Sequence, residues 1–277
     1  MRMKKQAALF FFLWFCPAAG VSAAAEAFSV PAPGMALSAP SGAPMPHRVR
    51  RVVLDAGHGG KDSGAVSPHG LKEKRLTLEM ARKVKAVLEA RGMEVVMTRD
   101  SDRFIPLAER ARIANIREAD FFVSIHANAS ETPSLRGFEV YYLSEATNDS
   151  ELAVERAENS AVRFESAPPA PSKQLKTIFW DLRESENRRE SLHIAQNVMD
   201  AVGGSMDIAA RRVRTANFFV LKWTECPAVL VEMGYLTNGQ DERRLRSRAY
   251  KMELAQAIVD GIWRHKTEYE ATNGFTQ

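Results

Sequence analysis

The chain has 277 residues, of which 45% are hydrophobic and 26% charged, and its formal net charge is +4 at pH 7. This length can bury a substantial core, and the composition is that of an ordinary globular protein, not of a disordered or fibrous one. No block of Lys and Arg with interleaved aromatic residues stands out. The mild basicity therefore does not indicate nucleic-acid binding.

Residues 1–27 have the layout of a secretory signal peptide. Basic residues within positions 2–5 precede a ten-residue apolar run, Ala7–Cys16, and small residues follow. The run is too short for a membrane-spanning helix, so we expect export and no membrane span after processing. Cleavage after Ala23, Ala25 or Ala27 is compatible with the pattern.

The two cysteines of the chain are Cys16 and Cys226. A lipoprotein signal that uses Cys16 is disfavoured, because the bulky Trp14 and Phe15 precede it. Removal of the signal peptide would leave Cys226 alone, which excludes an internal disulfide and catalysis by paired thiols.

Strands alternate with amphipathic helices from Val49 onward, after a Pro-, Ala-, Ser- and Gly-rich stretch at 28–48 that predicts a flexible linker. The predicted strands are Arg51–Leu54, Glu94–Thr98, Phe121–Ile125, Gly137–Leu143, Asn217–Lys222 and Ala228–Glu232. The predicted helices are Arg75–Ala90, Leu107–Arg117, Leu175–Val202 and Tyr250–Lys266. This alternation predicts a single α/β domain over residues 49–270, with a mostly parallel or mixed twisted sheet, helices on both faces and a tail at 271–277.

Residues 145–173 do not fit this alternation. They lie between a predicted strand and a predicted helix, carry many charges and contain the sequence APPAP at 167–171. Small and apolar residues recur at helical spacing within the segment, and a stripe of carboxylates follows another face: Glu151, Glu155 and Glu158. The pattern predicts an extra helix with a broken connection, and a solvated surface helix is the simplest interpretation of such a stripe.

The glycine-rich sequence LDAGHGGKDSGA, residues 54–65, is not a phosphate-binding loop. The Walker pattern needs four residues between its first Gly and the Gly-Lys pair, whereas only two separate Gly57 from Gly60, and the dinucleotide spacing also fails. The loop follows a predicted strand, where functional groups of α/β sheets gather. His58 is therefore a candidate metal ligand.

Two further strands end on residues of the same kind, His126 in FFVSIHANAS and Glu232 in VLVEMGYLTN. A catalytic zinc site often takes two His and one carboxylate, and the missing carboxylate is most simply Glu73, just ahead of a helix. Glu79 falls inside that helix and is the weaker candidate. Each of these residues also has an ordinary structural alternative, such as a first-turn acid or a buried ion pair. The other histidines lack this setting and are expected to be structural or surface residues: His47, His69, His193 and His265.

Several motifs, in this order, closely resemble those of the zinc-dependent N-acetylmuramoyl-L-alanine amidases of the type 3 family. They are LDAGHGGKDSGA, GLKEKRLTLEMARKV, TRDSDRFIPLAERARIAN, FVSIHANAS, GFEVYYLS and VLVEMGYLTN. The resemblance extends from about Val52 to the C-terminal helix. It implies one α/β amidase domain, one zinc ion, and cleavage of the amide between the lactyl group of N-acetylmuramic acid and the L-alanine of the stem peptide in peptidoglycan.

The resemblance also assigns roles by position. It implies that His58, Glu73 and His126 are zinc ligands and that Glu232 is the catalytic carboxylate, which takes a proton from water and hands it to the departing amine. Asn128, next to the metal loop, is a candidate for orienting a ligand or binding substrate, with turn stabilisation as the alternative.

The sequences KTIFWDLRESENRRESL and AENSA are similar to those of the division-associated amidases of Gram-negative bacteria. This similarity implies a periplasmic enzyme of cell-wall remodelling and daughter-cell separation. In such enzymes an inserted helix covers the zinc site and supplies a carboxylate to it, and an activator with a LytM-type domain displaces the helix. By position the blocking residue is Glu158, with Glu155 as the second choice, although three prolines interrupt the segment.

Two other functions remain compatible with these residues. A zinc peptidase acting within stem peptides or proteins would use the same chemistry on a different amide. A catalytically silent wall-binding protein on the same scaffold is disfavoured, because all four residues of the predicted site are present.

Overall fold

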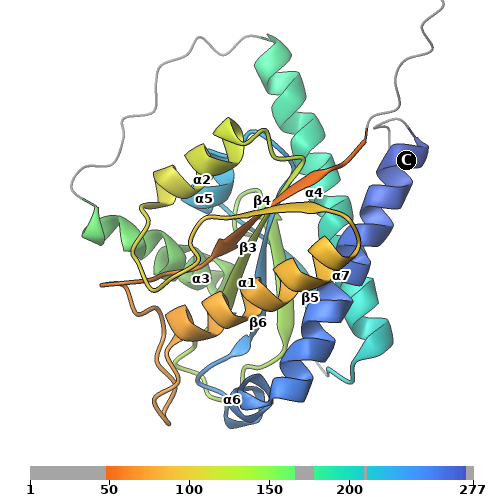
Figure 1. Ribbon diagram of the computed structural model, residues 1–277. Helices are drawn as coiled ribbons and strands as arrows, with labels where there is room; N and C mark the ends of the chain where they lie inside the picture. Colours follow the sequence, from red (N-terminus) through yellow and green to blue (C-terminus); the bar gives the residue numbers. More distant parts are fainter. Residues whose placement is uncertain (1–47, 166–177, 209–210, 273–277) are drawn as a thin grey trace, which may run out of the picture. The chain divides into compact units, whose positions relative to one another are not determined.

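The computed structural model describes residues 48–165, 178–208 and 211–272 (Figure 1). The predicted signal peptide, nearly all of the predicted linker and the APPAP sequence lie outside these residues. The six strands form one sheet: β1 (Arg51–Ala56), β2 (Glu94–Met97), β3 (Phe121–Asn128), β4 (Phe138–Leu143), β5 (Arg211–Ala216) and β6 (Ala228–Tyr235). Their order is β2-β1-β3-β6-β4-β5, and β4 runs antiparallel to β6 while the other neighbours are parallel. The predicted mixed α/β sheet is confirmed.

Helices cover both faces of this sheet, because successive side chains of a strand point to opposite faces. On one face lie α1 (Glu73–Ala90), α4 (Ile178–Ser205) and α7 (Arg248–Ala271). On the other lie α2 (Leu107–Ile116), α3 (Asp149–Asn159), the 3₁₀ turn η1 (Ser160–Phe164) and α5 (Phe219–Lys222). The short helix α6 (Gly239–Arg246) follows β6. No helix among the described residues is long and apolar enough to cross a membrane.

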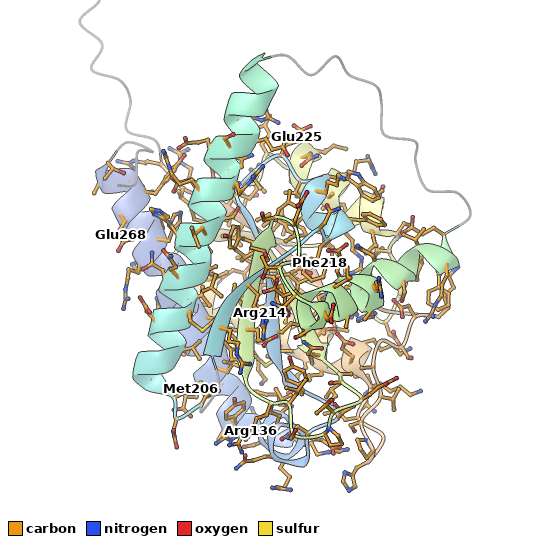
Figure 2. The ribbon with its side chains drawn as sticks, turned by 180° about the vertical axis from the view of Figure 1, so that it is seen from behind. Arg136, Met206, Arg214, Phe218, Glu225 and Glu268 are labelled. Carbon is orange, nitrogen blue, oxygen red and sulfur yellow. The ribbon has the colours of Figure 1, made fainter. Side chains whose placement is uncertain are left out.

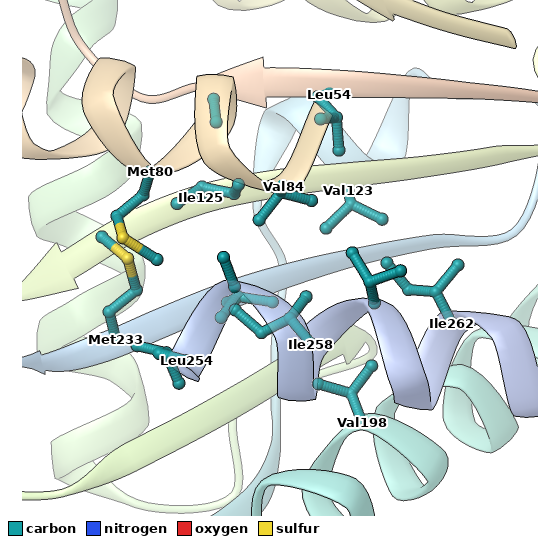
Figure 3. Close-up of a cluster of buried hydrophobic side chains, with 14 of the residues drawn as sticks. Leu54, Met80, Val84, Val123, Ile125, Val198, Met233, Leu254, Ile258 and Ile262 are labelled. Carbon is teal, nitrogen blue, oxygen red and sulfur yellow. The ribbon is translucent and has the colours of Figure 1, made fainter. Parts of the chain in front are cut away.

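The larger core lies between the sheet and the layer of α1, α4 and α7 (Figure 3). Val123 of β3 packs there with Val84 of α1 and Ile258 of α7, and all three side chains are fully buried. Burying such a side chain contributes about 1.5–3 kcal/mol. The two helices are thereby held over the strands whose carboxyl ends carry the predicted site.

The predicted strand Asn217–Lys222 is wrong. Its apolar half forms α5, and the strand is the preceding Arg211–Ala216. The sequence RRVRTA looks too charged for a strand, but it contains Arg214, which Figure 2 labels. Nε of Arg214 lies 2.9 Å from the buried carboxylate of Glu139 on β4. An ion pair between neighbouring strands thus replaces the apolar alternation on which the prediction depended.

The helix α6 was also not predicted. It is short and strongly polar, and Leu245 is its one buried apolar side chain. Its N-cap residue is Asn238, whose side chain accepts hydrogen bonds from the backbone N–H groups of Gln240 and Asp241. Capping rather than an apolar face therefore identifies this helix.

Candidate metal centre

The loop after β1 brings His58 into a position that requires glycine at two places in the loop, Gly57 and Gly64. A Cβ atom on Gly57 would lie 2.4 Å from the ring of His126, and one on Gly64 would lie 2.5 Å from Oε2 of Glu73. The absence of these side chains lets the three residues converge. His58 itself has φ of +59°, a left-handed conformation that costs a non-glycine residue about 1–2 kcal/mol.

Glu73 is held by backbone groups from the loop after β1 and from strand β3. It is the first residue of α1, and its carboxylate accepts hydrogen bonds from the N–H of Ala65 at 2.8 Å and of Ala127 at 3.1 Å. The positive end of the helix dipole also favours a carboxylate at this place. These contacts fix the side chain between the loop that carries His58 and the strand that carries His126.

Four side chains converge on one point. Oε1 of Glu73 lies 3.0 Å from Nε2 of His58 and 3.1 Å from Nδ1 of His126. Oε2 of Glu158, from the inserted helix α3, lies 2.7 Å from Nδ1 of His126 and 3.2 Å from Nε2 of His58. The four candidate ligand atoms all lie within 4.8 Å of one another.

The outer nitrogen of His58 is also occupied. Its Nδ1 atom lies 2.8 Å from Oδ2 of Asp62, and both side chains are buried. A carboxylate behind a histidine fixes the orientation and tautomer of the ring, as at many metal sites. Asp62 therefore turns Nε2 of His58 toward the cluster.

The cluster attracts positive charge. Within the described part of the chain, the ion-pair partners of Glu73 and Glu158 are the two histidines. Burial lowers the pKa of a histidine, but the carboxylates of Glu158 and Glu73 outweigh it and raise the pKa of His126 to about 10. Burial also lowers the pKa of His58, but the charges of Glu73 and Glu158 outweigh burial and raise this pKa well above its usual value. A bound cation would replace the protons that these histidines otherwise hold.

The donor set fits a metal ion. Nε2 of His58 and Oε2 of Glu158 are buried but make no hydrogen bond of good geometry within the described part of the chain, although they lie close together. Ligand atoms that surround one tetrahedral ion at about 2.0–2.1 Å are separated by about 3.3 Å, close to the spacing seen here. Two imidazole nitrogens and carboxylate oxygens suit zinc and its neighbours better than magnesium or calcium, which prefer oxygen ligands alone.

Glu232 lies beside this group and is not part of it. It is fully buried on β6, where the sheet register places it opposite His126 of β3. Neither of its carboxylate oxygens has a hydrogen-bond partner among the described residues. Burial, and next the charge of Glu158, raise the pKa of Glu232 well above its usual value. The site thus contains a carboxyl group with a raised affinity for protons.

Asn128 lies two residues beyond His126 on β3. Its Oδ1 atom accepts a hydrogen bond from the N–H of Ala129, as a turn-stabilising residue would. Its Nδ2 atom is buried and has no hydrogen-bond partner in the part of the chain that the structure describes. The side-chain NH2 group of Asn128 therefore remains available to donate, and its role in substrate binding stays a prediction.

The helix α3 confirms the predicted extra helix, but its carboxylates are not a solvated face. Glu151 is buried and lies 3.4 Å from Nη1 of Arg214, and Glu155 accepts a hydrogen bond from the N–H of Asn217 at 2.9 Å. Glu158 reaches the metal centre instead. The interpretation as a solvated surface helix is therefore wrong for these three residues.

The remaining titratable candidates lie away from the cluster. Glu79 pairs with Lys251 at 2.6 Å, and His69 lies 2.7 Å from the carboxylate of Glu242. His265 is in the core against the ring of Phe121. His193 is not part of the group of candidate ligands either, and His47 lies outside the described residues.

Comparisons with known proteins identify the family of the chain. A family model described as N-acetylmuramoyl-L-alanine amidase matches residues 52–264. The amidase AmiC of Neisseria meningitidis is 38% identical over 229 residues, which cover 80% of this chain and 55% of that protein. AmiA of Escherichia coli is 35% identical over 217 residues, which cover 77% of this chain and 75% of that protein. The chain therefore spans about half the length of the first relative and three quarters of the second.

Solved structures show the same fold. The amidase AmiC2 of Nostoc punctiforme superposes with a TM-score of 0.58 at 35% identity, covering 78% of this chain and 96% of that chain. The catalytic domain of CwlV from Bacillus (Paenibacillus) polymyxa gives a TM-score of 0.56 at 32% identity, covering 78% and 97%.

Proposed function

The chain belongs to the N-acetylmuramoyl-L-alanine amidase family, and on this basis we propose that it hydrolyses the amide between N-acetylmuramic acid and L-alanine in peptidoglycan. The observation that carries this function is the convergence of His58, Glu73 and His126 next to the unpartnered carboxyl group of Glu232. Hydrolysis of an amide needs a polarised carbonyl, an activated water and a proton for the leaving nitrogen. These residues can supply all three with one zinc ion.

His58, Glu73 and His126 would hold the zinc ion. When bound, zinc supplies a Lewis acid that polarises a carbonyl and makes hydroxide available near neutral pH. Asp62 keeps the ring of His58 turned toward the ion through its contact with Nδ1. Two neutral imidazoles and one carboxylate leave the ion with a net positive charge, which this chemistry requires.

Glu232 would act as the general base and then as the general acid. A raised pKa makes a carboxylate a stronger base near pH 7, so it can take the proton of the attacking water. It can then deliver that proton to the departing nitrogen of L-alanine. No Lys or Arg of the described residues pairs with Glu232, so no salt bridge to such a residue lowers its pKa again.

The inserted helix would keep the enzyme inactive. Glu158 takes the place at the centre that substrate needs, and α3 and η1 are held by further polar contacts. Asn159 accepts a hydrogen bond from the N–H of Phe219, and Nζ of Lys61 donates to the carbonyl of Phe164 at 2.6 Å. Such a covered site suits a wall hydrolase that an activator with a LytM-type domain releases.

The cellular setting follows from the N-terminal sequence. The predicted signal peptide would export the chain to the periplasm, where peptidoglycan is accessible. There the enzyme would remodel the cell wall and separate daughter cells. A zinc peptidase that cuts within the stem peptide would use the same cluster and is the second candidate.

Digestion of purified peptidoglycan, followed by mass spectrometry of the soluble products, tests this function. The protein would be used with zinc, with a chelator, and as the Glu158→Ala variant. We expect free stem peptides that begin with L-alanine, dependent on zinc and more abundant with Glu158→Ala. Products cut inside the stem peptide would support the peptidase instead, and no products from any form would indicate a silent wall-binding protein.

A further inference from the structure

We infer that Arg110 is a positioning residue for His58, so that zinc affinity depends on a guanidinium that does not touch the metal centre. This role rests on the proposed zinc site. Arg110 belongs to α2, on the face of the sheet opposite α1, and only 2% of it is exposed. Its side chain extends from the α2 face of the sheet to the loop after β1.

The guanidinium of Arg110 binds the backbone of His58 directly. Its Nη2 atom donates to the carbonyl of His58 at 2.9 Å, and Nη1 donates to the carbonyl of Ala56 at 2.8 Å. His58 has the left-handed backbone conformation that residues other than glycine rarely adopt. A strained conformation persists only where its surroundings hold it. The bonds of Arg110 to the carbonyls of Ala56 and His58 hold the backbone on both sides of the strained φ angle of His58.

The opposite side of Arg110 is anchored as well. Nε donates to the carbonyl of Ile105 at 2.8 Å, and Nη1 lies 2.9 Å from Oδ1 of Asp55 on β1. Asp55 is itself fixed by the hydroxyls of Thr98 at 2.6 Å and Ser124 at 2.8 Å. Arg110 therefore links the rigid centre of the sheet to the backbone of His58. Asp62 fixes the ring of the same residue, so backbone and ring are held independently.

A second buried arginine offers a matched comparison. Arg99 is fully buried, and its donors reach the carbonyls of Ala56 at 2.9 Å and Gly57 at 2.7 Å. Nε and Nη2 of Arg99 thus hold the same loop, but neither bonds the carbonyl of His58. Both arginines are buried, carry a positive charge and bind the backbone of the loop after β1. Only Arg110 also binds the carbonyl of His58.

Lysine cannot reproduce these contacts. An ammonium group is a single point of charge, whereas the planar fork of Arg110 donates to three carbonyls and one carboxylate. Arg110→Lys would keep a positive charge near Asp55 and lose the fixed geometry at His58. Loss of residues that orient a metal ligand typically weakens metal binding about 10–100-fold.

The experiment measures the dissociation constant of zinc for the full-length wild type, Arg110→Lys and Arg99→Lys by competition with a chromogenic chelator. The thermal midpoint of each metal-free protein is measured alongside. We expect the Kd of Arg110→Lys to rise about 10–100-fold, and that of Arg99→Lys to stay within about threefold of wild type, even if both variants unfold at lower temperature.

Three results would overturn this role of Arg110. An unchanged Kd in Arg110→Lys, or an equal rise in both arginine variants, would show that Arg110 serves only general stability while the zinc site stands. Absence of zinc binding in the wild type would overturn the proposed site and this role together. Should Arg110→Lys fail to fold, Asp55→Asn replaces it, because it loosens the anchor of Arg110 and keeps the side-chain shape. A raised Kd then supports the role, and an unchanged Kd overturns it.

Discussion

Oε2 of Glu158 lies 2.7 Å from Nδ1 of His126. The carboxylate of Glu73, the first residue of α1, lies 3.1 Å from the same nitrogen. Helix α3 thus delivers a carboxylate to the point where three other candidate ligands converge. In this arrangement the centre has a full set of four protein groups, as structural zinc sites do, whereas catalytic sites keep one position open. The proposed hydrolysis would therefore require Glu158 to leave.

Glu158→Ala should raise activity in the absence of any activator. Minor states commonly make up about 0.1–10% of a protein population, so removal of the blocking group is expected to raise the rate about 10–1,000-fold. Release of dyed fragments from labelled peptidoglycan measures this rate. Glu155→Gln is the matched control on the same helix, because its amide oxygen can still accept the N–H of Asn217. Equal rates for wild type and Glu158→Ala would contradict a blocking role.

Glu232→Gln should separate metal binding from turnover. Loss of a general base costs about 10²–10⁴-fold in rate, while the zinc Kd should not change, because Glu232 is outside the group of candidate ligands. The thermal midpoint should stay equal or rise, since a buried ionisable group without a hydrogen-bond partner is replaced by an amide that carries no charge. Retention of wild-type kcat by Glu232→Gln would refute its catalytic role.

Removal of zinc should lower both activity and stability. A chelator is expected to abolish hydrolysis, and zinc at about 100 times its Kd should add about 2.7 kcal/mol to the free energy of unfolding. Differential scanning calorimetry with and without zinc measures this increment. His69→Gln is a control outside the cluster that should keep the full increment. A melting curve insensitive to zinc in the wild type would argue against a zinc site at His58.

Glu242 should make stability depend on pH. Burial alone would raise its pKa, but hydrogen bonds from His69, Ser67 and Arg246 outweigh it and lower the pKa to about 2, from an ordinary value of 4.5. A lowered pKa in the folded state contributes stability above about pH 4.5, which is lost as the pH falls toward 2. Wild type should therefore be more stable than Glu242→Gln at neutral pH, with the difference shrinking through this window.

Urea unfolding between pH 2 and 7 measures that difference. The exposed Glu253 provides the control, and Glu253→Gln should differ little from wild type throughout. A difference for Glu242→Gln that stays constant over the whole range would contradict the shifted pKa.

The sequence allowed the central residues to be predicted because they lie at the ends of strands. His58, His126 and Glu232 follow apolar runs in an alternating α/β pattern, and parallel strands bring such ends to one edge. Glu73 could be predicted because α1 starts close behind the His58 loop. The ligand group therefore depends on local sequence and on one topological rule.

Other features depend on contacts between residues far apart in the chain, and no local pattern indicates them. In the sequence Arg110 is an ordinary helix residue, and its contact with the loop after β1 is apparent only from the position of α2 in the fold. The strand β5 was not predicted because the charge of Arg214 is typical of an exposed segment, and its partner Glu139 lies on another strand. Glu158 was predicted from family resemblance, and its carboxylate reaches His126 because β5 and α5 hold α3 against the sheet.

Anomalous X-ray diffraction at the zinc edge, on crystals of the purified protein, tests the central claim most directly. The account predicts one zinc peak bounded by Nε2 of His58, Nδ1 of His126 and the carboxylates of Glu73 and Glu158. Zinc bound elsewhere, or a centre that lacks zinc in the presence of excess metal, would contradict it.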